Sequence, residues 1–215
     1  MKHLSHFLLL VLLCCHATAG DLQVRFVDAS GEAITDAVIE IITPNIPAPN
    51  DWDYLGKMDQ IDKEFIDNVV TIVAGSYVRF PNSDKIQHHV YSFSDNKSFE
   101  LPLYFAEEAD PILFDVPGVA VVGCNIHDWM LGYIYVSASH LVAKSDYQGL
   151  ATISGLIPGD YTFQIWHERA RRGDQFATYD ATVSGTGIST VDVELNLGRD
   201  RRIRRAPTSS HGTYN

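Results

Sequence analysis

The chain has 215 residues, of which 16 are Lys or Arg and 27 are Asp or Glu, so its formal net charge is −11 at pH 7. An acidic chain of this kind repels nucleic acid and is suited to a basic partner surface. The length is sufficient for one large domain or two small ones, each with its own hydrophobic core.

Residues 1–19 have the features of a secretory signal peptide. Lys2 precedes an apolar run over Phe7–Cys15, and Ala17-Thr18-Ala19 supplies the small-x-small pattern of a cleavage site. The run is too short to cross a bilayer as a stable helix. We therefore expect cleavage after about Ala19, a periplasmic location and no stable membrane insertion. Loss of Lys2 leaves 15 basic against 27 acidic residues, a formal charge of −12.

One cysteine, Cys124, remains once the signal peptide is removed. Exported proteins usually pair their cysteines, so a single one needs an explanation. One explanation is a small buried core residue. The other is a thiolate held by a metal ion, which also protects the sulfur from oxidation.

The hydrophobic pattern predicts an all-β protein. Short runs rich in Val, Ile, Tyr and Phe are separated by Gly, Pro, Asn and Asp. Leu22–Val27 and Ala37–Ile42 are expected to be strands, and apolar residues alternate over Tyr161–Ile165 and Val191–Leu197. The segment Asp59–Asp67 is expected to form one or two short helical turns.

The chain divides into four expected segments after the signal peptide: residues 20–50, 51–138, 139–197 and 198–215. Turn motifs of the form Asp-x-x-Gly in the first and third segments resemble those of prealbumin-like (carboxypeptidase regulatory-like) sandwich domains. The resemblance implies one discontinuous sandwich, residues 20–50 plus 139–197, into which 51–138 is inserted. A simple tandem of two domains is the alternative. The basic tail 198–215 is expected to be disordered, or to tether the chain to an acidic partner or anionic lipid.

The segment Gly123–Met130 carries the residues with metal chemistry. Cys124, His127 and Met130 occupy the first, fourth and seventh positions of a short loop between two apolar runs. A histidine pair, His88-His89, lies on what should be a neighbouring strand. Cu(I) prefers soft sulfur and Cu(II) prefers imidazole nitrogen, so two His, one Cys and a distant thioether suit both oxidation states. Zinc is less suited, since a thioether is a poor zinc ligand and no second cysteine is present.

These residues resemble the cupredoxins, the family of plastocyanin and amicyanin. The Cys-x-x-His-x-x-Met spacing resembles the short-loop, amicyanin-like members. Phe80-Pro81-Asn82, the run His88–Ser94 and the run Cys124–Asp128 look most like the periplasmic proteins labelled methylamine utilization proteins. The resemblance is strong over roughly residues 58–137 and implies a Greek-key sandwich.

The resemblance also implies one type 1 (blue) copper ion. Its equatorial ligands would be His88, Cys124 and His127, and its axial ligand would be Met130. Strand alternation places His89 on the same face as Tyr91 and Phe93, which looks the more apolar face. This argument favours His89, but in cupredoxins the ligand histidine is commonly followed by Asn and then a β-branched residue, and His88-His89-Val90 fits if His89 takes the Asn position. We predict His88 as the upstream ligand, with His89 as the alternate or as a hydrogen-bond donor near the site.

These features predict a one-electron carrier that is not itself an enzyme. An apolar patch of Ile126, Trp129 and Leu131 around His127 would dock a redox partner whose identity the sequence does not give. The alternative function is a copper chaperone or buffer with the same ligands in a more open site. A metal-free adhesion or carbohydrate-type sandwich is a third reading, which the Cys, His and Met spacing disfavours.

Overall fold

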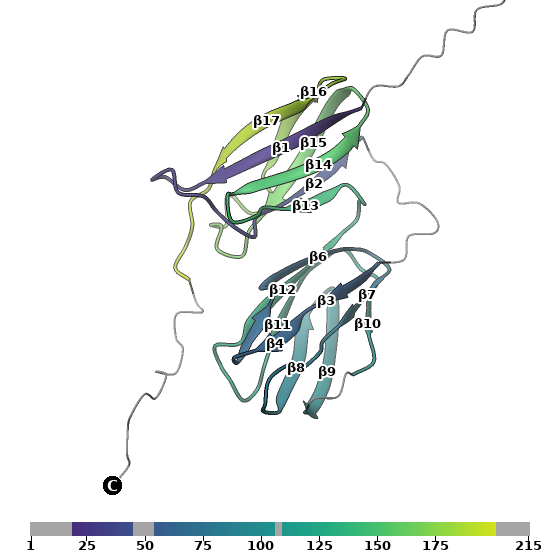
Figure 1. The fold of residues 1–215 in the computed structure, drawn as a ribbon, viewed down its shortest axis with the longest axis vertical. Coiled ribbons are helices and arrows are strands. Elements are labelled where there is room, and N and C mark those ends of the chain that lie inside the picture. Colours follow the sequence, from purple (N-terminus) through teal and green to yellow (C-terminus); the bar gives the residue numbers. More distant parts are fainter. Residues whose placement is uncertain (1–18, 45–53, 106–108, 201–215) are drawn as a thin grey trace, which may run out of the picture.

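The computed structural model describes residues 19–44, 54–105 and 109–200, and in these ranges it contains seventeen strands and no helix. The all-β prediction is confirmed. No helix in these ranges is long and apolar enough to cross a membrane. The predicted signal peptide and nearly all of the basic tail lie outside the described residues. Two units, each built of facing sheets, lie end to end along the long axis of the molecule (Figure 1).

The first unit is assembled from both ends of the described chain. Its strands are β1 (Gly20–Val27), β2 (Val38–Thr43), β13 (Val142–Lys144), β14 (Leu150–Leu156), β15 (Gly159–Trp166), β16 (Thr178–Val183) and β17 (Ile188–Glu194). They form a three-stranded sheet, β14-β1-β17, and a four-stranded sheet, β13-β2-β15-β16. Because β1 pairs in parallel with β17, segments more than 160 residues apart share one sheet. Buried side chains from both sheets, including Phe26, Ile39 and Phe163, form one core.

The second unit contains all the strands between β2 and β13. Its strands are β3 (Leu55–Lys57), β4 (Asp59–Ile61), β5 (Glu64–Ile66), β6 (Val69–Val73), β7 (Ser76–Arg79), β8 (His88–Ser94), β9 (Lys97–Tyr104), β10 (Ile112–Phe114), β11 (Gly118–Gly123) and β12 (Leu131–Ser137). A five-stranded sheet, β6-β12-β11-β8-β9, faces a three-stranded sheet, β10-β7-β3. Phe80, Val90, Phe114, Val122 and Ile134 are fully or almost fully buried in the core of this unit.

The expectation of helical turns over Asp59–Asp67 is wrong. Strands β4 and β5 form an antiparallel hairpin in which Gln60 is paired with Phe65. The two connecting residues, Asp62 and Lys63, have φ angles of 54° and 62°. Two consecutive left-handed residues are what a tight two-residue hairpin turn requires, and Asp tolerates that conformation better than most residues.

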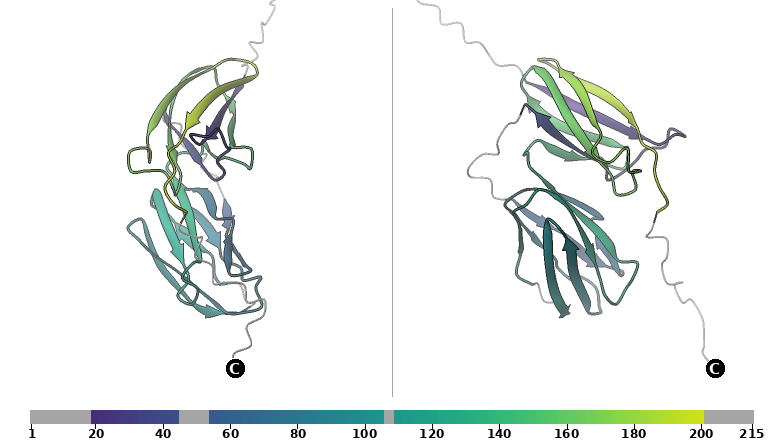
Figure 2. Two further views of the ribbon diagram at one scale, coloured as in Figure 1. Left: turned by 90° about the vertical axis from the view of Figure 1, so that its left-hand side faces the viewer. Right: turned by 180° about the vertical axis from the view of Figure 1, so that it is seen from behind.

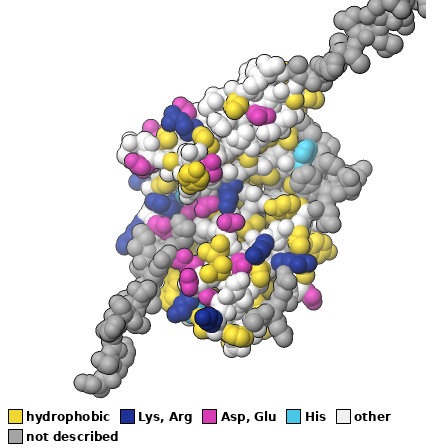
Figure 3. All heavy atoms as spheres, in the orientation of Figure 1, with side chains coloured by type: hydrophobic (Ala, Val, Ile, Leu, Met, Phe, Trp, Pro, Cys, Tyr) yellow, Lys and Arg dark blue, Asp and Glu magenta, His cyan; other side chains and the backbone are white. Residues whose placement is uncertain are grey.

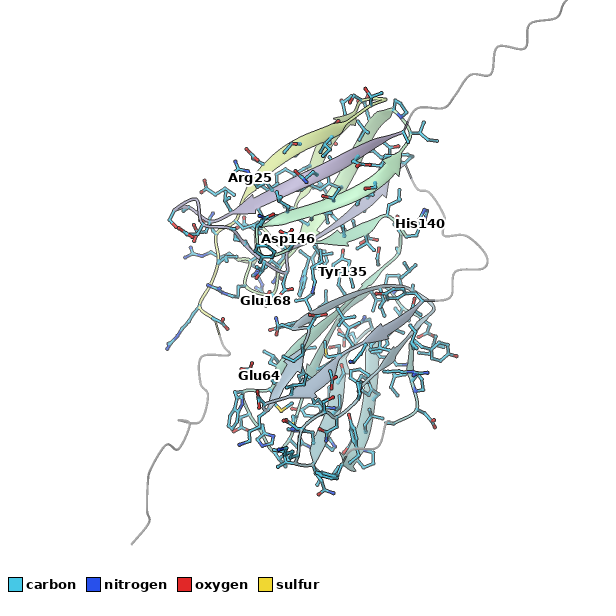
Figure 4. All side chains as sticks on the ribbon, viewed as in Figure 1. Arg25, Glu64, Tyr135, His140, Asp146 and Glu168 are labelled. Atoms are coloured by element: carbon cyan, nitrogen blue, oxygen red, sulfur yellow. The ribbon has the colours of Figure 1, made fainter. Side chains whose placement is uncertain are left out.

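A buried network joins the two units. Glu40 of β2 accepts hydrogen bonds from Tyr135 Oη of β12 at 2.6 Å and from the Ala138 amide at 2.8 Å. Val38, Val69 and Trp166 surround this network as a small apolar cluster with Tyr135. Tyr135 accordingly lies between the units (Figure 4). The two further views also show the units one above the other (Figure 2). The predicted domain boundaries and the prealbumin-like character of the first unit stay predictions.

Candidate metal centre

Three of the four predicted site residues converge at one end of the five-stranded sheet. His88 is the first residue of β8, Cys124 directly follows β11, and His127 lies in the loop from β11 to β12. Strand β11 pairs with both β8 and β12, through Gly123↔Tyr91 and Gly123↔Leu131. The pairing places the ends of the three strands side by side, and with them the three side chains.

The three side chains direct their donor atoms at a common point. Cys124 Sγ lies 3.9 Å from His88 Nδ1 and 3.8 Å from His127 Nδ1. One potential ligand atom from each residue lies within 4.8 Å of the other two. A metal bonded to sulfur at about 2.3 Å and to nitrogen at about 2.0–2.1 Å, with ~120° between the bonds, holds these atoms ~3.8 Å apart. The donor set therefore fits a trigonal metal ion.

The site is deeply set on one side and reaches the surface on the other. His88 has 0% and Cys124 4% of its surface exposed, whereas His127 is half-buried. Burial and three fixed strand ends restrict movement of the ligands. The half-buried ring of His127 gives the centre its contact with the surface.

Met130 closes the loop that carries Cys124 and His127. Its amide donates to the His127 carbonyl at 2.9 Å, and its side chain is buried in the same core cluster as Cys124. The sulfur is thus held inside the unit that contains the site. Its assignment as the axial ligand stays a prediction.

The far nitrogen of His88 is held by a carboxylate. His88 Nε2 lies 2.7 Å from Asp84 Oδ2, which leaves Nδ1 directed at Cys124. Burial alone would raise the pKa of Asp84, but hydrogen bonds from the Lys63 amide, His88 and the Asp62 amide outweigh it and lower that pKa. A carboxylate on the second nitrogen of a ligating histidine fixes both the ring and its tautomer.

His127 is held by an aromatic neighbour. Its ring centroid lies 5.3 Å from that of Trp129, whose Nε1 donates to the Lys63 carbonyl at 3.1 Å. Burial, followed by the charges of His88 and Lys63, lowers the pKa of His127. A lowered pKa keeps the imidazole neutral near pH 7, and the neutral form is the one that binds metal.

His89, the alternate upstream ligand, lies away from the cluster. Its Nε2 is 2.8 Å from Glu100 Oε1, on the strand face that also carries Tyr91 and Phe93. This face was expected to be the more apolar, but Phe93 is 76% exposed, whereas Val90 on the opposite face is fully buried. The inner face of β8 is therefore the one that presents His88 to the site.

Sequence reasoning missed the part played by the hairpin turn at Asp62–Lys63. Asp84 bonds to His88 and accepts hydrogen bonds from both turn amides. A second missed feature is Gln60, a fully buried residue whose Nε2 is hydrogen-bonded to Tyr104 Oη and to the Pro81 carbonyl. Burial raises the pKa of Tyr104 to about 12. Polar and apolar residues do not alternate over Asp59–Ile66 and neither turn residue is glycine, so the sequence carries no clear signal for this hairpin.

No family model and no curated protein matches the chain. Among solved structures, a Cu-containing nitrite reductase from Thermus scotoductus SA-01 is similar at 25% identity and TM-score 0.36, over 39% of this chain and 22% of that one. A purple cupredoxin from Nitrosopumilus maritimus is similar at 20% identity and TM-score 0.34, over 38% of this chain and 99% of that one. A reduced Cu(I) form of an amicyanin variant is similar at 19% identity and TM-score 0.36, over 46% and 97%.

These similarities cover less than half of the chain, and the chain spans only about a fifth of the nitrite reductase. The assignment of class therefore rests on the strands and the donor atoms themselves. They define an all-β protein with a preformed His-Cys-His cluster suited to a metal ion.

Proposed function

We propose that the protein is an exported type 1 copper protein of the cupredoxin kind that carries single electrons. The observation that carries the proposal is the placement of Cys124 Sγ between two imidazole Nδ1 atoms at 3.8 and 3.9 Å. A bound copper ion would supply the Cu(II)/Cu(I) couple. A site of two imidazoles and one thiolate suits both oxidation states, and Met130 is the residue we assign to the axial position.

The chain's own residues keep the site ready for both states. Asp84 orients His88, the Trp129 ring contacts His127, and the buried position of Cys124 excludes water from the sulfur. Ligands that are held in place change little between oxidation states. Small rearrangement favours electron transfer over transfer of the metal itself.

We place the contact with the redox partner at the His127 end of the molecule. Ile126 is 49% exposed, and Trp129 and Leu131 are half-buried. A small apolar patch around a half-buried ligand is what a transient redox interface uses. On the face seen in Figure 3, acidic and basic side chains are interspersed, so charge of one sign does not dominate that side.

The alternative is a copper chaperone or buffer, and the half-buried His127 is the observation that favours it. Cyclic voltammetry and copper transfer to a Cu(I) chelator separate the two functions. A carrier gives a reversible one-electron wave and retains copper over many turnovers. Rapid loss of copper to the chelator, without a reversible wave, would assign metal handling instead.

A further inference from the structure

One two-residue turn is hydrogen-bonded to Asp84 and to Trp129, the two residues that contact the histidines of the candidate centre. Asp62 and Lys63 connect β4 to β5, and both have left-handed φ angles. In this conformation the two successive amides point the same way, and paired amides of this kind bind a carboxylate well. The Lys63 carbonyl remains available to accept a further hydrogen bond.

The first contact runs from the turn to His88. The Asp62 amide donates to Asp84 Oδ1 at 2.7 Å, and the Lys63 amide donates to Asp84 Oδ2 at 2.8 Å. Asp84 Oδ2 is also 2.7 Å from His88 Nε2. Each carboxylate oxygen of Asp84 therefore accepts a hydrogen bond from a backbone amide, and Oδ2 also contacts the imidazole. The orientation of His88 consequently depends on the conformation of the turn.

The second contact runs from the same turn to His127. The Lys63 carbonyl accepts a hydrogen bond from Trp129 Nε1 at 3.1 Å. The Trp129 ring packs against the His127 ring with 5.3 Å between centroids. The loop that carries His127 is thereby attached to a hairpin turn, through two residues that lie 66 positions apart in the chain.

We propose that the Asp62–Lys63 turn positions both histidines of the metal centre, His88 through Asp84 and His127 through Trp129. The inference rests on the proposed function, because it concerns the same site. It adds that the geometry of the site depends on residues other than the ligands. Residues that never touch the metal set the distance between the two Nδ1 atoms, both before and after metal is bound.

Contacts to the core hold the hairpin in the same shape when no metal is bound. Phe65 of β5 is buried in the core of the second unit, and Gln60 of β4 bonds the Pro81 carbonyl. The turn is therefore fixed at its base by the core. It can act as a rigid reference for both histidines.

The test compares variants that cut one contact each with variants that leave both intact. Asp84→Asn removes one acceptor oxygen, and Trp129→Phe removes the indole donor but keeps an aromatic ring. Glu100→Gln is the matched control for the first, because it alters the His89–Glu100 pair outside the cluster. Lys63→Arg is the control for the turn, because arginine keeps the backbone amide, the carbonyl and the positive charge near His127.

Three readouts are used on the purified protein. Nitrogen-15 NMR of the metal-free protein reports the tautomer and mobility of the His88 and His127 rings. Competition with a chelator reports the Cu(II) dissociation constant, and EPR of the loaded protein reports the copper hyperfine splitting. Loss of support for a ligating histidine costs about 10–100-fold in metal affinity.

We expect Asp84→Asn and Trp129→Phe to mobilise the histidine rings, to weaken Cu(II) binding by about 10–100-fold and to change the hyperfine splitting. The two control variants should match the unaltered protein. Ring signals and Cu(II) affinity that stay unchanged in both test variants would overturn the inference while leaving the copper site intact. If the unaltered protein binds no copper, the proposed function fails, and the NMR of the metal-free rings still decides the role of the turn.

Discussion

Asp84 and His88 lie four residues apart, and the carboxylate meets the imidazole at 2.7 Å on the side of the ring opposite Cys124. The negative charge therefore lies one ring away from the position of the metal. An anionic group so placed favours the higher charge of the metal, Cu(II) over Cu(I). Asp84 thus joins the hairpin turn to the redox chemistry proposed for the site.

The first prediction concerns the reduction potential. Asp84→Asn removes the charge beside His88, which should raise the reduction potential of the copper protein by tens of millivolts, where about 59 mV is a tenfold change in equilibrium constant for one electron. Voltammetry of both proteins at pH 7 measures the shift. A potential that falls on substitution would contradict the electrostatic role assigned to Asp84.

The second prediction concerns the junction between the two units. Glu40 accepts four hydrogen bonds, from Tyr135, Gln164 and the amides of Ala138 and Ser139. Glu40→Gln replaces one acceptor oxygen by a donor that would face another donor in this buried network. We expect a loss of roughly 2–4 kcal/mol in the free energy of unfolding, measured by urea denaturation. Unchanged stability would mean that the network does not hold the units together.

The third prediction concerns pH and Asp59, which is buried and accepts hydrogen bonds from the Gln60 amide and Ser83 Oγ and pairs with Lys57. Burial tends to raise the pKa of Asp59, but these partners outweigh it and lower that pKa below its usual value near 3.9. A lowered carboxyl pKa contributes stability that is present above about pH 4 and is lost as the pH falls through the folded-state value.

Asp59→Asn should therefore reduce the free energy of unfolding at pH 7 by about 1–3 kcal/mol, and by less at pH 3. Urea denaturation of the two proteins at several pH values measures the difference. A difference that grows as the pH falls would contradict this assignment.

The fourth prediction tests close packing beneath the ligand loop. A Cβ at Gly132 would lie 3.0 Å from Met58 Sδ and 3.2 Å from Phe65 Cβ, both in the buried core. Gly132→Ala should lower the free energy of unfolding by about 1–3 kcal/mol. Gly159→Ala, where nothing lies within 4 Å of the added atom, is the control. Equal thermal midpoints for the two variants would count against tight packing at Gly132.

The fold class and the members of the His88, Cys124 and His127 cluster could be predicted from the sequence, and the reason is physical. Alternation of apolar residues marks strands directly, and the spacing of Cys124, His127 and Met130, taken together with the upstream histidine pair, indicates a metal site where each residue alone would not. What sequence could not supply was the hairpin turn. Asp62 and Lys63 carry no glycine signal, and their contacts to Asp84 and Trp129 depend on tertiary packing.

The choice between His88 and His89 shows the same limit. Alternation separates the two side chains onto opposite faces of β8, but it does not say which face is covered. The facing sheet decides this, because it buries Val90 and leaves Phe93 exposed. Register against β11 then brings His88, and not His89, to Cys124.

The most direct test of the account is the visible absorption and EPR spectrum of the protein loaded with Cu(II), beside a Cys124→Ala control. We predict an intense blue thiolate-to-copper band with a narrow hyperfine splitting, both absent from the control. A pale spectrum that is unchanged by the loss of Cys124 would contradict the type 1 copper site.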